Sequence, residues 1–254
     1  MQLNYQIEGP DNAQVVVLSG SLGTTLAMWE PQMASLTARY RVLRYDTHGH
    51  GVTRKSGQVD LAQLGRDVIA LLDHLDIAAA HFCGISMGGL TGLWLACHHP
   101  QRMLSVAVIN SAARIGDEAG WRARAQTVRA EGMRAIAASA PERWFSPAFR
   151  RSSPETVAAL CQQLAETSAE GYAACCDALA TADLRAEIAS IRLPVLLIAG
   201  KEDPVTTVAD AQFMHQRIAG SSMLTVNASH LSTIEAPEAV NAALLSFLGE
   251  QHAG

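Results

Sequence analysis

A serine flanked by glycines stands where an apolar run gives way to a stretch of small residues. Residues 84–88 read Gly-Ile-Ser-Met-Gly, follow the apolar segment 80–83 and lead directly into the helical pattern 89–96. A sharp turn between a buried strand and a helix lifts such a serine hydroxyl out of the sheet and exposes it as a nucleophile. Cβ atoms at the two flanking positions would collide with neighbouring backbone, and glycine avoids that collision. The motif therefore predicts Ser86 as the nucleophile of an acyl-transfer reaction.

A serine nucleophile needs a base to take its proton, and the base needs a third group that fixes its tautomer. In a strand-turn-helix architecture of this kind, the acid and then the histidine follow the serine along the chain. His230 comes directly after a predicted strand, in a loop that can aim its ring back at the serine. His215 falls inside a helical pattern and His252 lies in the C-terminal tail, so we predict His230 as the base.

The acid of the set should follow the preceding strand. Asp203 comes after the apolar run 195–199, separated from it by Gly-Lys-Glu and followed by a proline that ends the strand. Glu202 is the rival candidate, and Asp183 is a third one, before the strand. Ser86, Asp203 and His230 occupy three strand ends in the required order, so we predict that they form a catalytic triad.

The negative charge that develops on an attacked carbonyl oxygen requires hydrogen-bond donors. The amide of Met87 is one predicted donor, because it lies in the first turn of a helix, at the positive end of the dipole. A second amide should come from the loop 20–24, Gly-Ser-Leu-Gly-Thr, which follows the apolar run 15–19. By position we predict Leu22 and Met87 as the oxyanion hole.

The pair His48 and His50 could suggest a metal site. No cluster of carboxylates and histidines accompanies the pair, and a glycine-rich turn explains it better. We therefore expect no metal.

The composition excludes several classes of partner. The formal net charge is −5 and no basic tract stands out, so we expect no nucleic-acid partner. The amino terminus lacks a signal-peptide pattern and no apolar run reaches the length of a membrane span, so we expect a cytoplasmic protein without a membrane partner. The five cysteines show no metal-ligand spacing and predict reduced, mostly buried thiols. The sequence makes no prediction of the oligomeric state.

Short apolar runs alternate with helical patterns along the chain. Because these runs are nearly continuous, they predict strands buried on both faces, and hence a mostly parallel sheet covered by helices, an α/β fold. Apolar residues at helical spacing predict helices over 61–75, from 88 to about 98, and over 237–247. The predicted strands are Val15–Ser19, Val42–Asp46, His81–Ile85, Val106–Asn110, Val195–Ala199 and Met223–Val226.

The alternation of strands and helices stops over residues 114–184, where alanine-rich helical patterns occur without a strand. A helical segment inserted after a strand predicts a cap over the carboxyl ends of the strands, where open α/β sheets place their ligands. We therefore predict a core made of 1–113 and 185–254 and a helical cap made of 114–184. A second helical domain with its own partner is the alternative.

These motifs and several shorter segments resemble the α/β-hydrolase family and, within it, the enol-lactonases. The serine motif, the acid and the histidine are shared across the family, whereas the Ser-Leu-Gly-Thr loop and the Arg-Trp-Phe segment are more particular. The match spans almost the whole chain. The segments that carry it are residues 21–24, 28–29, 43–47, 49–51, 84–89, 110–116, 142–145 with Pro147, 199–204 and 229–231.

The resemblance implies an α/β-hydrolase fold with a helical cap and a hydrolase that needs no cofactor. The implied reaction opens a small-molecule lactone, 3-oxoadipate enol-lactone, to 3-oxoadipate in the β-ketoadipate pathway of aromatic compound degradation. This substrate carries a carboxylate and the protein is net acidic, so a local cation must bind it. Arg143 is the candidate, with Trp144 as an apolar wall; a surface Arg143 and a Trp144 in the core of the cap are the alternative.

Two positions depart from the enol-lactonase pattern: His48 stands in the place of an arginine and Gly20 in the place of an asparagine. If that arginine serves a substrate carboxylate, a slightly different lactone is expected; if it is a structural pin, the substrate is unchanged. Two other functions stay open. One is a general carboxylesterase or cofactor-free perhydrolase on the same fold, and the other is a non-catalytic ligand-binding member of the fold.

Overall fold

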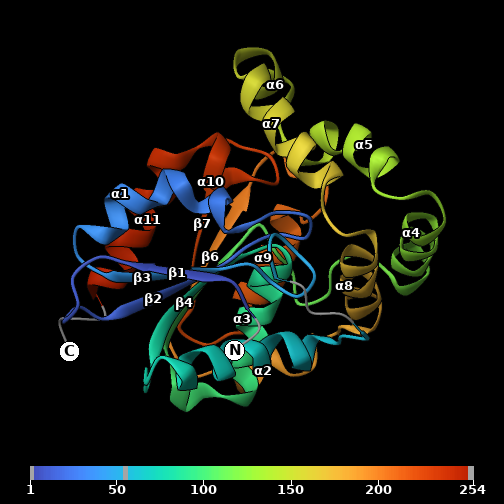
Figure 1. Ribbon diagram of the computed structural model, residues 1–254. Helices are drawn as coiled ribbons and strands as arrows, with labels where there is room; N and C mark the ends of the chain where they lie inside the picture. Colours follow the sequence, from blue (N-terminus) through green and yellow to red (C-terminus); the bar gives the residue numbers. More distant parts are fainter. Residues whose placement is uncertain (1–2, 54–56, 251–254) are drawn as a thin grey trace.

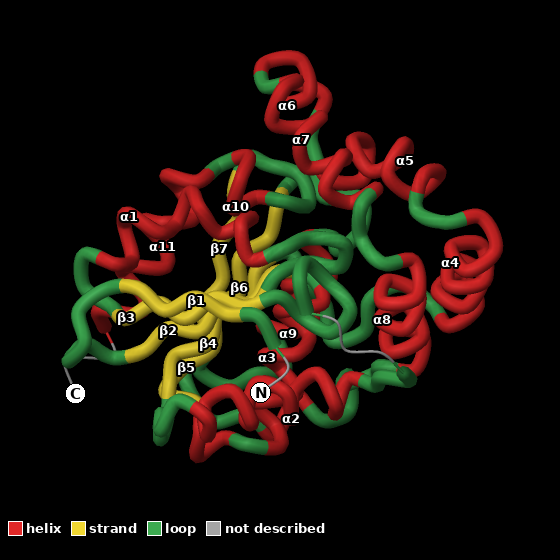
Figure 2. The backbone as a smooth tube through the Cα atoms, in the orientation of Figure 1, coloured by secondary structure: helices red, strands yellow, loops and turns green. Residues whose placement is uncertain are grey.

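The centre of the protein is a seven-stranded sheet, formed within residues 3–53 and 57–250, which the computed structural model describes. The strands lie side by side in the order β1-β3-β2-β4-β5-β6-β7 (Figure 2). All neighbouring pairs are parallel except β1 and β3, which are antiparallel. The strands are β1 Tyr5–Glu8, β2 Val15–Ser19, β3 Arg41–Tyr45, β4 Ala80–Ile85, β5 Met103–Ile109, β6 Val195–Gly200 and β7 Ser222–Val226.

Three of the inner strands are buried along their whole length. Every residue of β2, β4 and β6 is buried, and Val17 of β2 lies in register with Leu43 of β3 and Phe82 of β4. A strand covered on both faces favours apolar side chains at nearly every position, which is the pattern that the sequence shows. The predicted mostly parallel α/β sheet is confirmed.

The two edges of the sheet differ from the sequence prediction. β1 was not predicted, because its pattern alternates between half-buried Tyr5 and Ile7 and exposed Gln6 and Glu8 and contains no apolar run. The prediction that Met223–Val226 is buried on both faces is wrong. Within the described ranges β7 pairs only with β6, and in this edge strand only the last residue is buried.

Helices cover both faces of the sheet. Figure 1 shows α1 and α11 together on one face, and α2 and α3 on the other. The predicted helices over 61–75, 88–98 and 237–247 are confirmed. These outer helices are α1 Glu30–Thr37, α2 Leu61–His74, α3 Met87–His98, α9 Val208–His215, α10 Ser232–Glu235 and α11 Pro237–Glu250.

The chain between β5 and β6 is helical throughout its described elements, and we call its helices α4–α8 the cap helices. In Figure 1 they lie beside the sheet, away from α1 and α11. The division of the chain into a core and a cap of residues 114–184 stays a prediction. None of the helices in the described ranges combines the length and apolar character needed to cross a membrane. The cap helices are α4 Glu118–Glu131, α5 Arg134–Trp144, α6 Pro147–Ser152, α7 Pro154–Ala165 and α8 Ala169–Thr181.

The first turn of α8 packs directly on the turn that follows β3. A Cβ atom added to Gly171 would lie 2.4 Å from the carbonyl oxygen of Gly49, and one added to Gly49 would lie 2.3 Å from Cα of Gly171. Gly49 also has a φ of +69°, a conformation that favours glycine. The two backbones touch without side chains between them, so this contact limits how closely the first turn of α8 approaches the turn after β3.

We expect Gly171→Ala to lower the free energy of unfolding by about 1–3 kcal/mol, because the new methyl group forces the two backbones apart. The matched control is Gly120→Ala. Gly120 occupies the same position of α4, with its amide bonded to a capping side chain as in α8, and its added Cβ would meet nothing closer than 3.4 Å. The control should stabilise the protein by up to about 1 kcal/mol. Urea unfolding measures both; equal effects would contradict the close contact.

Candidate active site

Ser86 lies on the turn between β4 and α3. Its backbone has a φ of +56° and a ψ of −119°, a conformation that residues with a side chain seldom adopt. A Cβ at Gly84 would lie 2.1 Å from the carbonyl oxygen of Gly88, and a Cβ at Gly88 would lie 2.2 Å from that of Ser19. The predicted collisions at both flanking glycines are therefore confirmed. Because glycine has no Cβ at these two positions, the strained turn can form here and hold the Ser86 hydroxyl at the edge of the sheet.

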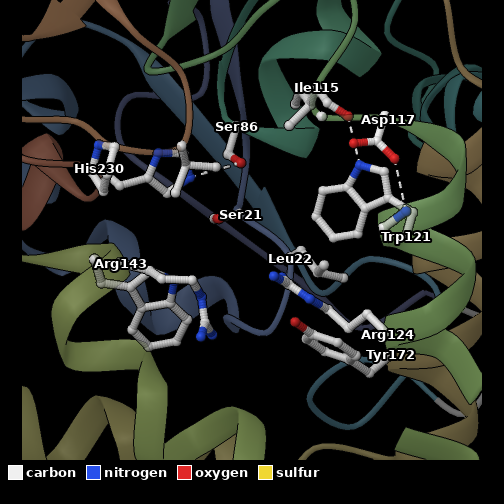
Figure 3. A pocket seen from close by; sticks show the side chains of 15 residues that line it. Ser21, Leu22, Ser86, Ile115, Asp117, Trp121, Arg124, Arg143, Tyr172 and His230 are labelled. Carbon is white, nitrogen blue, oxygen red and sulfur yellow. Dashed lines mark hydrogen bonds between the residues drawn. The ribbon is translucent and has the colours of Figure 1, made fainter. Parts of the chain in front are cut away.

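The side chains of His230 and Asp203 reach Ser86 from two later loops. His230 Nε2 lies 2.9 Å from Ser86 Oγ, and His230 Nδ1 lies 2.8 Å from Asp203 Oδ2 (Figure 3 shows the first of these bonds). All three residues are buried. Because the carboxylate only accepts, Nδ1 donates to it and Nε2 is left to accept the serine proton. The structure thus brings together the three residues that the sequence singled out.

The Asp203 carboxylate accepts hydrogen bonds at both of its oxygens. Asn110 Nδ2 and Thr206 Oγ1 each donate to Oδ2 at 2.8 Å, while the amides of Val205 and Thr206 donate to Oδ1 at 2.8 and 3.1 Å. Burial by itself would raise the pKa of Asp203, but the charge of His230 and the hydrogen bonds outweigh it and hold the pKa below its ordinary value. The carboxylate facing His230 is therefore ionised at neutral pH.

Asn110 belongs to this network, although the sequence analysis gave it no role. Besides Asp203, its Nδ2 donates to the carbonyl of Ser229 at 3.1 Å, and its Oδ1 accepts from the Ser232 hydroxyl. It lies one residue beyond β5 with a φ of +42°, which asparagine tolerates better than most residues. A polar residue at the end of an apolar run, next to the strand of the acid, is the signal that could have revealed it.

The rival candidates lie elsewhere. Glu202 is exposed. Asp183 forms a salt bridge with Arg185 at 2.6 Å. His215 is exposed and bonded to Ser221, and His252 lies outside the described residues.

The loop after β2 lies beside the serine turn. The amide of Gly88 donates to the carbonyl of Gly20 at 3.1 Å, and the amide of Thr24 donates to that of Ser21 at 3.1 Å. In the part of the chain that the structure describes, the amides of Leu22 and Met87 donate to no protein acceptor. Both residues are buried next to Ser86, so these two amides are available to an oxygen of a bound molecule.

A cavity of about 320 Å³ opens in front of Ser86 and His230. Ser21 and Leu22 line it from the loop after β2, and aromatic rings from the cap helices form much of the opposite wall (Figure 3). Its volume lies at the lower end of the range for small-molecule sites. The aromatic residues of the wall are Trp121, Trp144 and Tyr172.

Two arginines point into this cavity from different cap helices, Arg124 from α4 and Arg143 from α5 (Figure 3). The Arg124 guanidinium lies 4.8 Å from the centre of the Trp121 ring. Arg143 bonds to the Ser139 hydroxyl and, at 3.3 Å, to the carbonyl of Ile136. Among the residues that the structure describes, neither guanidinium forms a salt bridge with a carboxylate.

Burial and, after it, the positive charge of Arg124 lower the pKa of Arg143 below the ordinary arginine value. The two cations therefore repel each other across the cavity, and a bound anion would relieve that repulsion. The sequence analysis named Arg143 and missed Arg124. Arg124 lies one helical turn after Trp121 on the face of α4 that meets the cavity, and this spacing was the available signal.

His48 and Gly20, the two departures from the family pattern, lie outside this pair of cations. His48 is buried in the turn under α8, where its carbonyl accepts from His50 Nδ1 at 2.8 Å and from Cys175 Sγ at 3.5 Å. It is not one of the described residues that line the cavity. Gly20 packs against Thr24 and Met28, since an added Cβ would lie 2.8 Å from Thr24 Oγ1.

Comparison with known protein families identifies the class of protein to which this chain belongs. A family model described as "alpha/beta hydrolase fold" matches residues 14–237. The chain belongs to the α/β-hydrolase family.

Particular relatives are much more similar. The chain is 52% identical over 243 residues to 3-oxoadipate enol-lactonase 2 of Acinetobacter baylyi, an alignment that covers 95% of this chain and 91% of the relative. It is 50% identical over 236 residues to 3-oxoadipate enol-lactonase 1 of the same organism, covering 93% and 89%. The crystal structure of the enol-lactonase from Burkholderia xenovorans LB400 superposes with a TM-score of 0.95 at 44% identity, covering 97% of this chain and 96% of that one.

We expect Asn110→Asp to destabilise the fold more at high pH than at low pH. The new carboxylate would face Asp203 across a contact that is now 2.8 Å, so the folded pair would hold one proton with a raised pKa. Stability that depends on that proton is present at low pH and is lost as the pH rises through the raised pKa. Urea unfolding should show a loss of about 3 kcal/mol at about pH 8 and a smaller one at about pH 5.

The double variant Asn110→Asp with Asp203→Asn tests the cause of that loss, because it leaves a single carboxylate in the pair. It should recover most of the free energy lost at high pH. A loss that is the same at both pH values, or a double variant no more stable than Asn110→Asp, would contradict carboxylate repulsion.

Proposed function

We propose that this protein hydrolyses 3-oxoadipate enol-lactone to 3-oxoadipate through a covalent acyl-enzyme on Ser86. The observation that carries the proposal is the line of contacts from Asp203 through His230 to Ser86, at the wall of a cavity that holds two arginines without acidic partners. Relatives named as enol-lactonases, at about half identity over nearly the whole chain, support the choice of substrate.

In the proposed first half of the reaction, Ser86 Oγ attacks the lactone carbonyl while His230 Nε2 takes its proton. Asp203 holds the Nδ1–H tautomer and stabilises the imidazolium that forms. The amides of Leu22 and Met87 donate to the carbonyl oxygen as it becomes negative. The ring C–O bond then breaks, and the leaving oxygen departs as an enolate, which is stabilised by delocalisation and needs less help from an acid than an alkoxide does.

In the proposed second half, the enolate takes a proton from the His230 imidazolium and becomes the 3-oxo group of the product. The neutral His230 then takes a proton from a water molecule, which attacks the acyl carbon, and His230 returns this proton to Ser86 Oγ as the acyl–Oγ bond breaks. The carboxylate of the product forms from the lactone carbonyl and the water oxygen. Each step uses groups of the chain and water, so the proposed reaction requires no cofactor.

The substrate carboxylate should bind between Arg124 and Arg143. The protein has a net charge of −5, so long-range attraction does not bring an anion to the site, and the two local cations must do so. Trp144 is buried beside Arg143 and gives the lactone ring an apolar wall. A general carboxylesterase or perhydrolase would not need this charge, and a non-catalytic binding protein would not need the aligned triad.

Ser86→Ala should lower turnover of the enol-lactone by roughly three to six orders of magnitude, because no acyl-enzyme can form. Loss of the ultraviolet absorbance of the enol-lactone measures the rate. Ser105→Ala is the matched control, since Ser105 is a buried serine that bonds to His81 in the core. The control should keep its activity, and less than a tenfold loss in Ser86→Ala would defeat the covalent route.

Arg143→Leu and Arg124→Leu should each raise KM for the enol-lactone by about tenfold or more, because each removes a charged hydrogen-bond donor for the carboxylate. Hydrolysis of neutral p-nitrophenyl acetate should change little in both variants. Arg185→Leu is the control, because Arg185 pairs with Asp183 at the surface. An equal loss on the anionic and the neutral substrate would refute the assignment of the two arginines.

A further inference from the structure

The loop after β2 is held by a buried histidine that takes no part in the triad. The amide of Gly23 donates to His50 Nε2 at 2.8 Å, and His50 Nδ1 lies 2.8 Å from the carbonyl oxygen of His48. His50 is fully buried in the turn after β3, on an element separate from the loop that it contacts. The loop and the turn are thus joined by one imidazole ring.

The two partners fix the tautomer of His50. A backbone carbonyl only accepts and an amide N–H only donates, so Nδ1 carries the proton and Nε2 presents its lone pair to Gly23. Burial lowers the pKa of His50, an effect larger than the opposing effects of the His48 carbonyl and the Asp46 carboxylate, and this keeps the ring neutral. Both ring nitrogens of His50 are thus occupied by backbone groups.

We propose that His50 is a positioning residue for the hydrolysis, which fixes the direction of the Leu22 amide by holding the amide of Gly23 next to it. This inference rests on the proposed function, in which the amides of Leu22 and Met87 stabilise the oxyanion. His50 is not one of the described residues that line the cavity, and its ring nitrogens bond to the backbone of Gly23 and His48, so it acts through the backbone of the loop.

The constraints on the loop explain why this one bond matters. On one side of Leu22, the carbonyl of Gly20 is held by the amide of Gly88 in the serine turn. On the other side, Gly23 has a φ of +84°, and a Cβ there would lie 2.4 Å from the Leu164 side chain of α7. Without His50, the buried Gly23 amide would lack an acceptor, and the peptide planes on both sides of it could rotate to find one.

The cap helix α8 packs against both His50 and the turn that carries it. Tyr172 of α8 lies beside the His50 ring, with centroids 6.4 Å apart, and it also lines the cavity. The contact of Gly49 with Gly171 places the backbone next to His50 directly against the same helix. The position of the loop after β2, which carries the Leu22 amide, therefore depends on the turn after β3 and not on the sequence of the loop alone.

Two substitutions of His50 distinguish the effect of losing the hydrogen bond to Gly23 from the effect of losing the volume of the imidazole ring. In His50→Gln the amide oxygen can stand where Nε2 stands and still accept from Gly23. In His50→Asn the amide nitrogen can replace Nδ1 and donate to the His48 carbonyl, but nothing reaches Gly23. His50→Asn should lower kcat for the enol-lactone by about 10- to 100-fold with little change in KM, because the lost interaction acts only in the transition state. His50→Gln should keep kcat within about threefold.

His81→Asn is the control for a buried histidine in general. His81 is as buried as His50 and bonds to Ser105 and Gln14 at the far end of β4 from Ser86. This variant should lose stability in urea unfolding and keep its kcat. Equal losses of kcat in His50→Asn and His50→Gln, or an unchanged kcat in His50→Asn, would overturn the proposal.

A measurement on the unmodified protein does not depend on the variants folding. Nitrogen NMR of the histidine rings should show His50 as the Nδ1–H tautomer, with a hydrogen-bond coupling from Nε2 to the Gly23 amide. Labelling Ser86 with a phosphonate, which places an anionic oxygen in the oxyanion hole, should shift the His50 Nε2 resonance and leave that of His81 in place. An Nε2–H tautomer, or a His50 signal that labelling does not move, would overturn the inference while leaving the proposed nucleophile intact. Failure of the phosphonate to label Ser86 would overturn the proposed function, and with it this inference.

Discussion

The hydrogen bond between Ser86 and His230 joins two residues that are 144 positions apart in the chain. Their strands are not neighbours, because β5 and β6 lie between β4 and β7. Three strand spacings of about 4.8 Å separate them by roughly 14 Å, so the histidine loop must fold back across the sheet edge. Gly200 makes this possible, since a Cβ there would lie 2.5 Å from the carbonyl oxygens of Ala228 and Ser229.

The returning histidine loop is fixed from both the core and the cap helices. Asn110 binds it from the end of β5, through the carbonyl of Ser229. The amide of Leu231 donates to the carbonyl of Trp144 at 3.0 Å, at the end of α5, and Glu235 accepts from the amides of Ser229 and Ser146. The cap helices therefore do more than cover the cavity, because the backbone beside Arg143 and Trp144 also holds the loop that carries His230.

The cavity of this protein carries positive charge although the chain as a whole is negative. The chain is net negative, yet Arg124 and Arg143 meet at the cavity without carboxylate partners among the described residues. Keeping two cations together in a partly buried space costs free energy, and the lowered pKa of Arg143 reflects that cost. In a chain with net negative charge, a cationic cavity concentrates the attraction for an anion at one point, next to Ser86.

The sequence by itself determined the parallel α/β sheet and the strand ends that carry Ser86, Asp203 and His230. It could do so because a strand buried on both faces favours a nearly continuous apolar run. The glycines around Ser86 are also a local signal, since a Cβ atom at either position would collide with neighbouring backbone. It missed β1 and the exposure of β7, since the place of a strand at the edge of a sheet depends on pairing rather than on its own residues. Only the tertiary structure drew attention to Asn110, Arg124 and His50, because Asn110 meets Asp203, His50 meets Gly23 and Arg124 faces Arg143 across the cavity, and the approach of these distant segments is decided by the folding of the whole chain.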